Sequence, residues 1–199
     1  MGSTANQSAP RHRPGGRTAR TTQCIHVAVL ELLTAQGHQA CTFQNVAARA
    51  GIERSTLYRR YRDRWAMIID AYATRAEVEV TVTPTGNFRT DFRQLTWRFA
   101  RFWSTSLAEA MLAAILAARG TPARDQVARF LDRRFAGFDD MFDQAIARGD
   151  LPATVDRVEM LERAAGSVVF HQLIAGRTID EAWVDRLVAD TLRSFPARS

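Results

Sequence analysis

Residues 42–61 carry the pattern of two short helices joined by a tight turn, and they read TFQNVAARAGIERSTLYRRY. Thr42 is placed to begin the first helix, because its hydroxyl can accept a hydrogen bond from a backbone N–H that the helix leaves free. Gly51 stands where the turn needs a residue that tolerates positive φ, and Ile52 can fill the angle between the helices. The spacing therefore predicts a helix-turn-helix.

The second of these helices has two chemically different sides. At about 100° per residue, Leu57 and Tyr61 lie together on the side that faces inward. The remaining sides combine arginines, hydroxyls and an aromatic ring, from Arg54, Ser55, Thr56, Tyr58, Arg59 and Arg62. Arginine can donate two hydrogen bonds to guanine, hydroxyls can bind base edges or phosphate, and a tyrosine ring can pack on a thymine methyl group. We interpret this helix as the recognition helix of a DNA-binding domain.

The positive charge of the chain is concentrated in the same region. The formal net charge is +6, and all 27 basic residues are arginine. Residues 1–64 hold ten arginines and three acids, whereas residues 65–199 hold 17 arginines and 18 acids. This asymmetry is typical of a polyanion-binding domain attached to a nearly neutral body. A basic stretch can also be an ordinary solvated surface, so charge alone leaves both interpretations open.

Apolar spacing along the rest of the chain is helical almost throughout, which predicts an all-α protein. We expect nine helices, over about residues 17–35, 42–50, 54–61, 64–80, 90–105, 107–119, 122–148, 154–175 and 179–195. Residues 1–16 are poor in apolar side chains, so we expect a flexible basic arm there. A three-helix DNA-binding domain at residues 17–64 would then be joined by a fourth helix to a C-terminal helical bundle within residues 65–199.

Composition and motifs exclude several other classes of protein. No apolar run approaches the roughly 18 residues of a membrane span, and the first residues lack the apolar core of a secretory signal, so we expect a cytoplasmic protein. Cys24 and Cys41 lie 17 residues apart without a metal-binding spacing, so we expect neither a disulfide framework nor a zinc site. We expect both cysteines to be small core residues, and no cofactor is indicated.

At these residues the chain resembles the TetR-like (tetracycline-repressor-like) family of bacterial transcriptional regulators. The family pattern is approximately T-x-x-x-I-A-x-x-A-G-V-S-x-x-T-L-Y-x-H-F-x-x-K-E-x-L, and the chain matches it over Thr42–Ala47, Ala50–Glu53, Thr56–Tyr61 and Arg64–Met67. The resemblance implies that the DNA backbone is bound by Thr42, Tyr58, Arg60 and Arg64. It implies that the bases are approached by Arg54, Ser55, Thr56 and Arg59. It also implies that the N-terminal arm can enter the minor groove.

Four positions depart from the family pattern. Glu53 replaces the commoner serine before the second helix, where an acid suits a helix N-terminus but repels phosphate. Arg60 stands where histidine is usual, which keeps or strengthens a phosphate contact. Arg64 replaces lysine and Trp65 replaces glutamate, so we expect the arginine to bind phosphate and the tryptophan to pack instead.

The C-terminal body carries most of the large aromatic side chains. By themselves they indicate the core of a helical bundle. The resemblance implies an inducer pocket between the helices of this region, for a small apolar or aromatic effector. Our candidates for its lining are Trp97, Phe102, Trp103, Met111, Phe138, Met141, Phe142 and His171. Ordinary core packing is the alternative for each of them.

The last two long helices have the features of a dimer surface. Residues 164–167 are a run of small side chains that would let two backbones approach closely. The final helix offers Trp183, Leu187 and Thr191. By resemblance, two such helices from each subunit form a four-helix bundle, and a two-fold dimer would bind a palindromic operator. Close packing within one subunit would also explain the small residues.

Three functions compete for this sequence. The first is a homodimeric repressor that a small-molecule effector releases from a palindromic operator. The second is a DNA-binding regulator without an effector, which acts through protein partners. The third is a helical enzyme, for which Ser167 and His171 on one helix face are the nearest approach to a catalytic pair, without any accompanying hydrolase motif. The helix-turn-helix and the charge distribution favour the first function, without catalysis.

Overall fold

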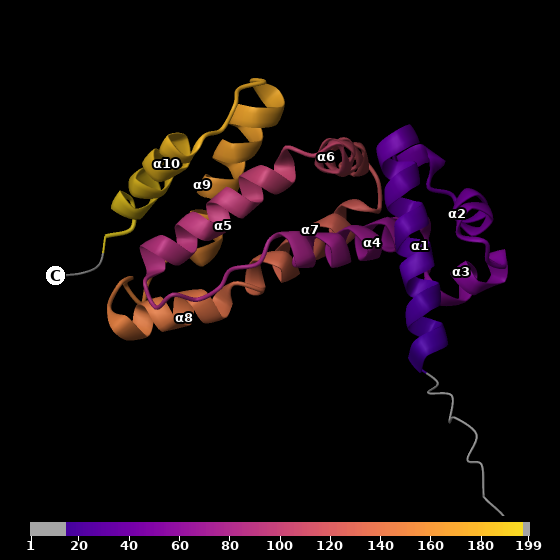
Figure 1. The fold of residues 1–199 in the computed structure, drawn as a ribbon, viewed down its shortest axis with the longest axis horizontal. Coiled ribbons are helices and arrows are strands. Elements are labelled where there is room, and N and C mark those ends of the chain that lie inside the picture. The colour runs from indigo at the N-terminus through magenta and orange to yellow at the C-terminus, as the bar shows by residue number, and fades with distance from the viewer. Residues whose placement is uncertain (1–14, 197–199) are drawn as a thin grey trace, which may run out of the picture.

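The computed structural model describes residues 15–196, and every regular element within them is helical (Figure 1). The all-α class predicted from the sequence is confirmed. The α-helices are α1 (Gly15–Gln36), α2 (Phe43–Ala50), α3 (Arg54–Arg60), α4 (Arg64–Glu79), α5 (Phe88–Trp103), α6 (Ser106–Ala118), α7 (Arg124–Ala136), α8 (Asp139–Arg148), α9 (Arg157–Val169) and α10 (Glu181–Arg193). A 3₁₀ turn, η1 (His38–Ala40), precedes α2, and a π-helical turn, η2 (Phe170–Ile174), follows α9. None of these helices combines the length and the hydropathy that crossing a bilayer requires.

The N-terminal region differs from the expectation in two respects. The arm expected over residues 1–16 lies outside the described residues except for its last two positions, which begin α1. Cys24 is exposed rather than in the core, because it shares the outer side of α1 with Val27 and Glu31. Cys41 is buried as expected, and burial raises the pKa of its thiol to about 11.

Capping side chains explain where most of the helices begin. The capping residues are Thr42, Asp63, Asn87, Thr105, Asp156 and Asp180. In each case the side-chain oxygen accepts a hydrogen bond from the backbone N–H three residues later. Because the first turn of a helix leaves its N–H groups without partners, each cap contributes about 1 kcal/mol. The caps therefore fix the starts of α2 and of α4.

The helix expected over residues 122–148 is divided into α7 and α8, so the described residues hold ten α-helices where nine were expected. Gly137 ends α7, and glycine is a poor helix former. The ring of Phe138 packs against the Arg134 guanidinium, and Cζ of Arg134 lies 4.6 Å from the centroid of that ring. Acidic side chains in the first turn of α8 then favour a new helix N-terminus. The division matters because it opens a cleft.

One helix links the two ends of the molecule (Figure 1). At one end α1 packs on α2 and α4, and α2 packs on α3. At the other end α5 packs on α8, α9 and α10. α4 leaves the first group and runs beside α7 toward the second. A single cluster of buried apolar side chains continues through both groups, and Ile25, Leu57, Ile68 and Phe92 are fully buried in it.

Candidate nucleic-acid interface

Backbone and side-chain hydrogen bonds fix the turn between α2 and α3. Thr42 begins α2 by accepting a hydrogen bond from the N–H of Asn45 at 3.1 Å. Gly51 lies in the left-handed region with φ 64°, where a side chain would be strained. Its N–H and that of Ile52 both donate to the carbonyl of Ala47. The predicted helix-turn-helix is confirmed.

α3 turns one face inward and one face to solvent. Leu57 is fully buried. The predicted base-contacting residues lie on the same helix, with Arg54, Ser55 and Arg59 exposed and Thr56 half-buried. Tyr58 is 61% exposed, its ring meets Phe43 edge-on at 4.8 Å, and the Arg54 guanidinium lies 5.5 Å from the ring centroid. The arrangement presents guanidinium, hydroxyl and aromatic groups together, which are the groups that read base edges and phosphates.

Two arginines predicted to bind phosphate also have partners within the chain. Arg60 donates through Nη1 to Oγ1 of Thr22 at 2.6 Å, which ties the end of α3 to α1. The Arg64 guanidinium lies 5.6 Å from the centroid of the Trp65 ring. Trp65 is buried and stacks on His38, so it packs as expected, and burial together with Arg64 lowers the pKa of His38. Both guanidinium groups are only half-buried and retain donors. Phosphate binding by them stays a prediction.

A polar network that the sequence did not indicate fixes the orientation of α3. Oδ2 of Asp70, on α4, accepts a hydrogen bond from the Tyr61 hydroxyl at 2.8 Å and lies 2.9 Å from Nε2 of His26 on α1. The contact with His26 holds the pKa of the Asp70 carboxyl below its usual range. Burial is the main cause that raises the pKa of the Tyr61 hydroxyl, and the hydrogen bond to Asp70 raises it further. The three residues are far apart in sequence, so no spacing pattern could reveal the network.

Replacing Asp70 should destabilise the N-terminal helices. An Asp70→Asn variant loses the carboxylate that serves both His26 and Tyr61. Because the Asp70 side chain is itself about half exposed, water screens part of this loss, and we expect the free energy of unfolding to fall by about 0.5–1 kcal/mol at neutral pH. Because the pKa of Asp70 is lowered in the folded state, the stabilisation is present above the unfolded-state pKa and is lost as pH falls through the folded-state value. Thermal melts from neutral to acidic pH should therefore show the two proteins converging.

The matched control for this prediction is Glu31→Gln. Glu31 pairs with Arg49 at 2.6 Å on the surface of the same group of helices, and both side chains are about half exposed. Exposed ion pairs contribute little, so this change should alter stability by less than about 0.5 kcal/mol. Equal melting temperatures for Asp70→Asn and the unmodified protein at neutral pH would show that the network does not stabilise the fold.

α7 is hydrogen-bonded to both ends of α4. At the start, Gln126 donates from Nε2 to Oδ2 of Asp63 at 3.1 Å. Burial would raise the pKa of Asp63, but hydrogen bonds from the Ala66 N–H and from Gln126 bring it below its usual value. At the far end, Arg134 donates from Nη2 to the carbonyl of Val80 at 2.7 Å. α7 therefore touches α4 both beside the helix-turn-helix and inside the body.

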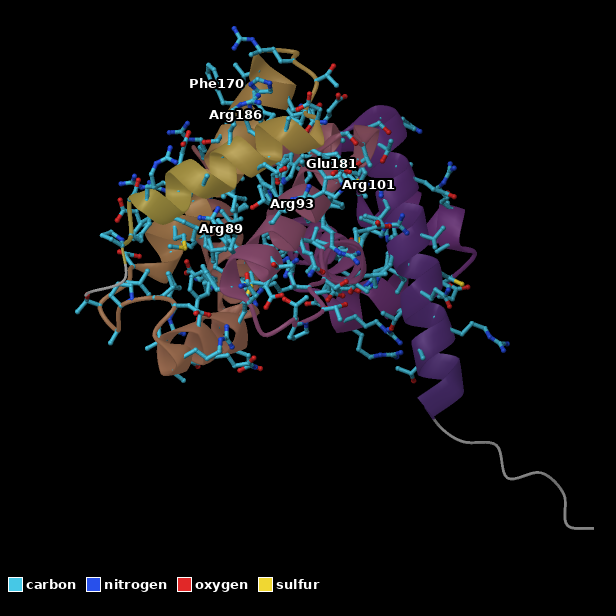
Figure 2. All side chains as sticks on the ribbon, turned by 60° about the vertical axis from the view of Figure 1, so that its left-hand side comes forward. Arg89, Arg93, Arg101, Phe170, Glu181 and Arg186 are labelled. Atoms are coloured by element: carbon cyan, nitrogen blue, oxygen red, sulfur yellow. The ribbon has the colours of Figure 1, made fainter. Side chains whose placement is uncertain are left out.

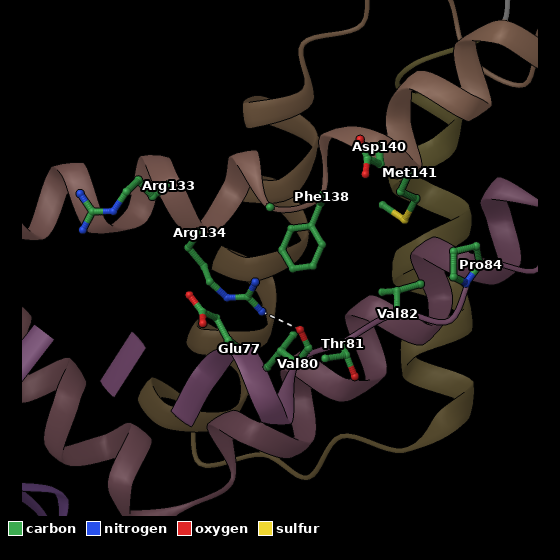
Figure 3. A pocket seen from close by; sticks show the side chains of 11 residues that line it. Glu77, Val80, Thr81, Val82, Pro84, Arg133, Arg134, Phe138, Asp140 and Met141 are labelled. Carbon is green, nitrogen blue, oxygen red and sulfur yellow. Dashed lines mark hydrogen bonds between the residues drawn. The ribbon is translucent and has the colours of Figure 1, made fainter. Parts of the chain in front are cut away.

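The eight residues predicted to line an effector pocket do not meet in one cavity. Phe138 and Met141 line a cleft of about 460 Å³ where α4 ends and α7 gives way to α8 (Figure 3). Arg134, which the sequence did not single out, lines it as well. The other six lie elsewhere. Phe102 borders a separate surface pocket, Trp103, Met111 and Phe142 are buried in the core, and Trp97 is half-buried. The His171 ring packs at a tilt on the Trp183 ring, with 4.5 Å between the two ring centroids. Aromatic character did not separate pocket from core, because both environments favour large rings.

Within residues 15–196, the pair considered for an enzyme is Ser167 near the end of α9 and His171 in η2. No hydrogen bond joins Ser167 to His171 in that range, and the His171 ring instead packs on Trp183. Among the described residues, no three histidine, cysteine, aspartate or glutamate side chains lie close enough together to hold a metal ion.

The outer side of α9 and η2 carries apolar side chains that no other part of residues 15–196 covers. Phe170 and Ile174 are each 62% exposed, and Val158 is 51% exposed. Figure 2 shows Phe170 at the end of the pair formed by α9 and α10, directed away from the body. Gly166 lies exposed in the middle of α9, and a Cβ atom there would meet nothing within 4 Å. The helix expected over residues 154–175 begins later than expected, at Arg157, and is α-helical only as far as Val169. The turn that follows it, η2, is π-helical.

Ion pairs join α10 to α5. Arg93 of α5 donates to Oε2 of Glu181 at 3.0 Å and to Oδ1 of Asp185 at 2.5 Å. Figure 2 shows Arg93 and Glu181 close together between these two helices. These ion pairs hold α10 against α5, and the side chains of Glu181 and Asp185 remain mostly exposed.

Family models match nearly the whole described chain. The model described as "Bacterial regulatory proteins, tetR family" matches residues 25–71, and the model described as "Tetracyclin repressor-like, C-terminal domain" matches residues 82–191. The first range contains the helix-turn-helix and the start of α4. The second contains most of the residues that line the cleft, all of α9 and most of α10.

Individual relatives give the same result. The chain is 25% identical to the uncharacterized HTH-type transcriptional regulator YdeS of Bacillus subtilis, over 95% of this chain and 96% of that protein. It is 29% identical to the DNA-binding transcriptional repressor TetR of Mycobacteroides abscessus, over 82% of this chain and 87% of that protein. The solved structure of the TetR family transcription regulator SCO0332 has a similar fold, with a TM-score of 0.72 at 24% identity, over 89% of this chain and 99% of that chain.

Proposed function

Because this chain belongs to the tetR family of bacterial regulatory proteins, we propose that it is a homodimeric repressor that a small-molecule effector releases from a palindromic operator. Its broader function is that of the family: it is a DNA-binding transcriptional regulator and not an enzyme. The proposal adds the assembly, the form of the operator and the response to a ligand.

The exposed face of α3 carries the DNA-binding part of the proposal. Because Leu57 is buried, it fixes the rotation of α3 about its own axis. Tyr58 and Arg59 are therefore directed toward solvent. In this arrangement Arg54, Ser55, Thr56 and Arg59 approach the bases of the major groove. The DNA backbone is then bound by Thr42, Tyr58, Arg60 and Arg64.

The uncovered face of α9 and η2 supports the dimer. A glycine inside a helix costs about 1 kcal/mol relative to alanine, and Gly166 has no close neighbour in its own chain that would require it. Close approach of a second backbone would explain the glycine. Phe170 and Ile174, on the same end of the molecule, would then be buried between the two copies.

The cleft beside α8 supports the effector. Its volume of about 460 Å³ falls within the range of small-molecule sites. One observation favours a regulator without an effector: the apolar cavity between α5, α7 and α9 holds only about 40 Å³. A thermal-shift screen of small molecules separates the two, since stabilisation by a ligand would support the first function and its absence the second.

DNA binding should be specific and strongly dependent on salt. Two of the four backbone-binding residues in each subunit, Arg60 and Arg64, are cations, so with four cations per dimer the affinity for an operator duplex should fall roughly 10²-fold as salt rises from about 50 to 200 mM. Fluorescence anisotropy with duplexes from the DNA upstream of the gene measures this, and an unrelated duplex of equal length is the control. If the upstream duplexes never bind better than the unrelated one, the proposed operator does not exist there.

A further inference from the structure

The cleft where α4 ends is lined by apolar side chains and by charged ones, among them Arg134 (Figure 3). Val82, Pro84 and Met141 are among the apolar ones. Arg134 reaches into the cleft from α7, beside the ring of Phe138. The site therefore combines a surface for hydrocarbon with a cation.

Arg134 is a half-buried cation without a carboxylate partner. Its recorded hydrogen bonds all use Nη2, which donates to the carbonyl of Val80 at 2.7 Å and to that of Ala76 at 3.5 Å. No ion pair to it occurs in residues 15–196, and burial lowers its pKa. A guanidinium group carries five N–H donors, so Nε and Nη1 remain able to bind an acceptor. An unpaired, partly desolvated cation in a cleft is a candidate ligand-binding group.

The other charged groups of the cleft are exposed. Glu77 and Asp140 are acidic, Arg133 is basic, and water screens all three. Glu77 is the one that attracts Arg134, and it would oppose an incoming anion. Because Arg134 is the least exposed of the four, it has the strongest influence on which charge the cleft accepts.

Arg134 and Phe138 also separate the cleft from the apolar cavity of about 40 Å³ inside the bundle, because both residues line both spaces. The cavity is otherwise lined by apolar side chains such as Leu95, Phe99 and Leu161. A ligand that draws the guanidinium outward would give its hydrocarbon part access to this second space.

We propose that the cleft binds a small amphipathic anion, with its carboxylate on the Arg134 guanidinium and its hydrocarbon chain against Pro84 and Met141. The inference rests on the proposed effector function and specifies the ligand class. A carboxylate accepts two parallel hydrogen bonds from a guanidinium, and either bidentate edge, Nε with Nη2 or Nη1 with Nη2, includes the nitrogen that donates to Val80. The charge-assisted pair is stronger than the bond to the neutral carbonyl and competes with it for Nη2. Taking Nη2 away from Val80 leaves the last carbonyls of α4 without this partner, so the anion acts on the helix that leads to the helix-turn-helix.

The test compares probes that differ only in the head group. Isothermal titration calorimetry of the whole chain with decanoate, decanol and decylamine should give binding at least about tenfold tighter for decanoate than for decanol, as expected for a charge-assisted pair. Arg134→Gln should abolish this preference. Arg133→Gln, which removes the neighbouring exposed guanidinium, should keep it. Glu77→Gln should strengthen decanoate binding several-fold.

The outcomes separate this inference from the proposed function. Equal affinities for decanoate and decanol, a preference that survives Arg134→Gln, or no binding of decanoate to the unmodified protein would each overturn it. If Arg134→Gln does not fold, the head-group preference of the unmodified protein and the effect of Glu77→Gln decide the question. Operator binding by the unmodified protein is measured without any probe, so it tests the proposed DNA-binding function independently.

Discussion

A Phe170→Asp variant is expected to be a folded monomer whose affinity for a palindromic operator is about 10²–10⁴-fold lower than that of the unmodified protein. Phe170 is mostly exposed, so the change costs the isolated chain less than about 0.5 kcal/mol. In a dimer the same position would place two carboxylates in an apolar contact, which carries a large desolvation cost. Once the subunits separate, each helix-turn-helix binds its half-site alone and the effective-concentration advantage is lost.

Native mass spectrometry measures the assembly, and anisotropy measures the affinity. Leu116→Asp is the matched control, because Leu116 is also about half exposed but lies on α6, away from α9 and α10. It should leave the dimer and the operator affinity unchanged. A Phe170→Asp protein that remains dimeric, or an unmodified protein that is monomeric at micromolar concentration, would contradict the assignment of this face.

The helix-turn-helix could be predicted because its determinants are local. Thr42 caps a helix through an N–H three residues away, and Gly51 satisfies a turn within its own neighbourhood. Leu57 and Tyr61 are placed inward by helical periodicity alone. Physical requirements that act within one turn of helix leave their signature in adjacent residues, so a single sequence reveals them.

The cleft could not be predicted because its determinants are distant in the chain. Arg134 donates to the carbonyl of Val80, 54 residues earlier in the chain, and the polar network around Asp70 likewise includes His26, 44 residues earlier. An arginine on a helix predicts nothing about which carbonyl it will meet. The interruption at Gly137 belongs to the same class, since a glycine inside a helical pattern is often tolerated. Here the helix ends at Gly137, and the ring of Phe138, the next residue, lies against the Arg134 guanidinium.

The second large effect should distinguish two arginines that both belong to the proposed DNA interface. Arg59→Ala removes an exposed guanidinium from the outward face of α3, and we expect it to cost about 1–3 kcal/mol in each half-site. Since this contact reads a base, the loss should be greatest for the true operator and small for unrelated DNA. The Arg59→Ala variant should therefore discriminate less between the possible bases at one base pair of each half-site. Binding to a set of duplexes with single base changes measures this.

Arg64→Ala should behave differently, because Arg64 stands at the start of α4 and is proposed to bind phosphate. Its loss should weaken operator and unrelated DNA by the same factor and reduce the slope of log affinity against log salt by about one unit per subunit. Arg98→Ala, an exposed arginine on α5 without a recorded ion pair in the described chain, is the control for net charge and should change neither. If Arg59→Ala and Arg64→Ala give the same uniform loss, α3 positions the protein on DNA without reading bases, and specificity must come from DNA shape or from the arm.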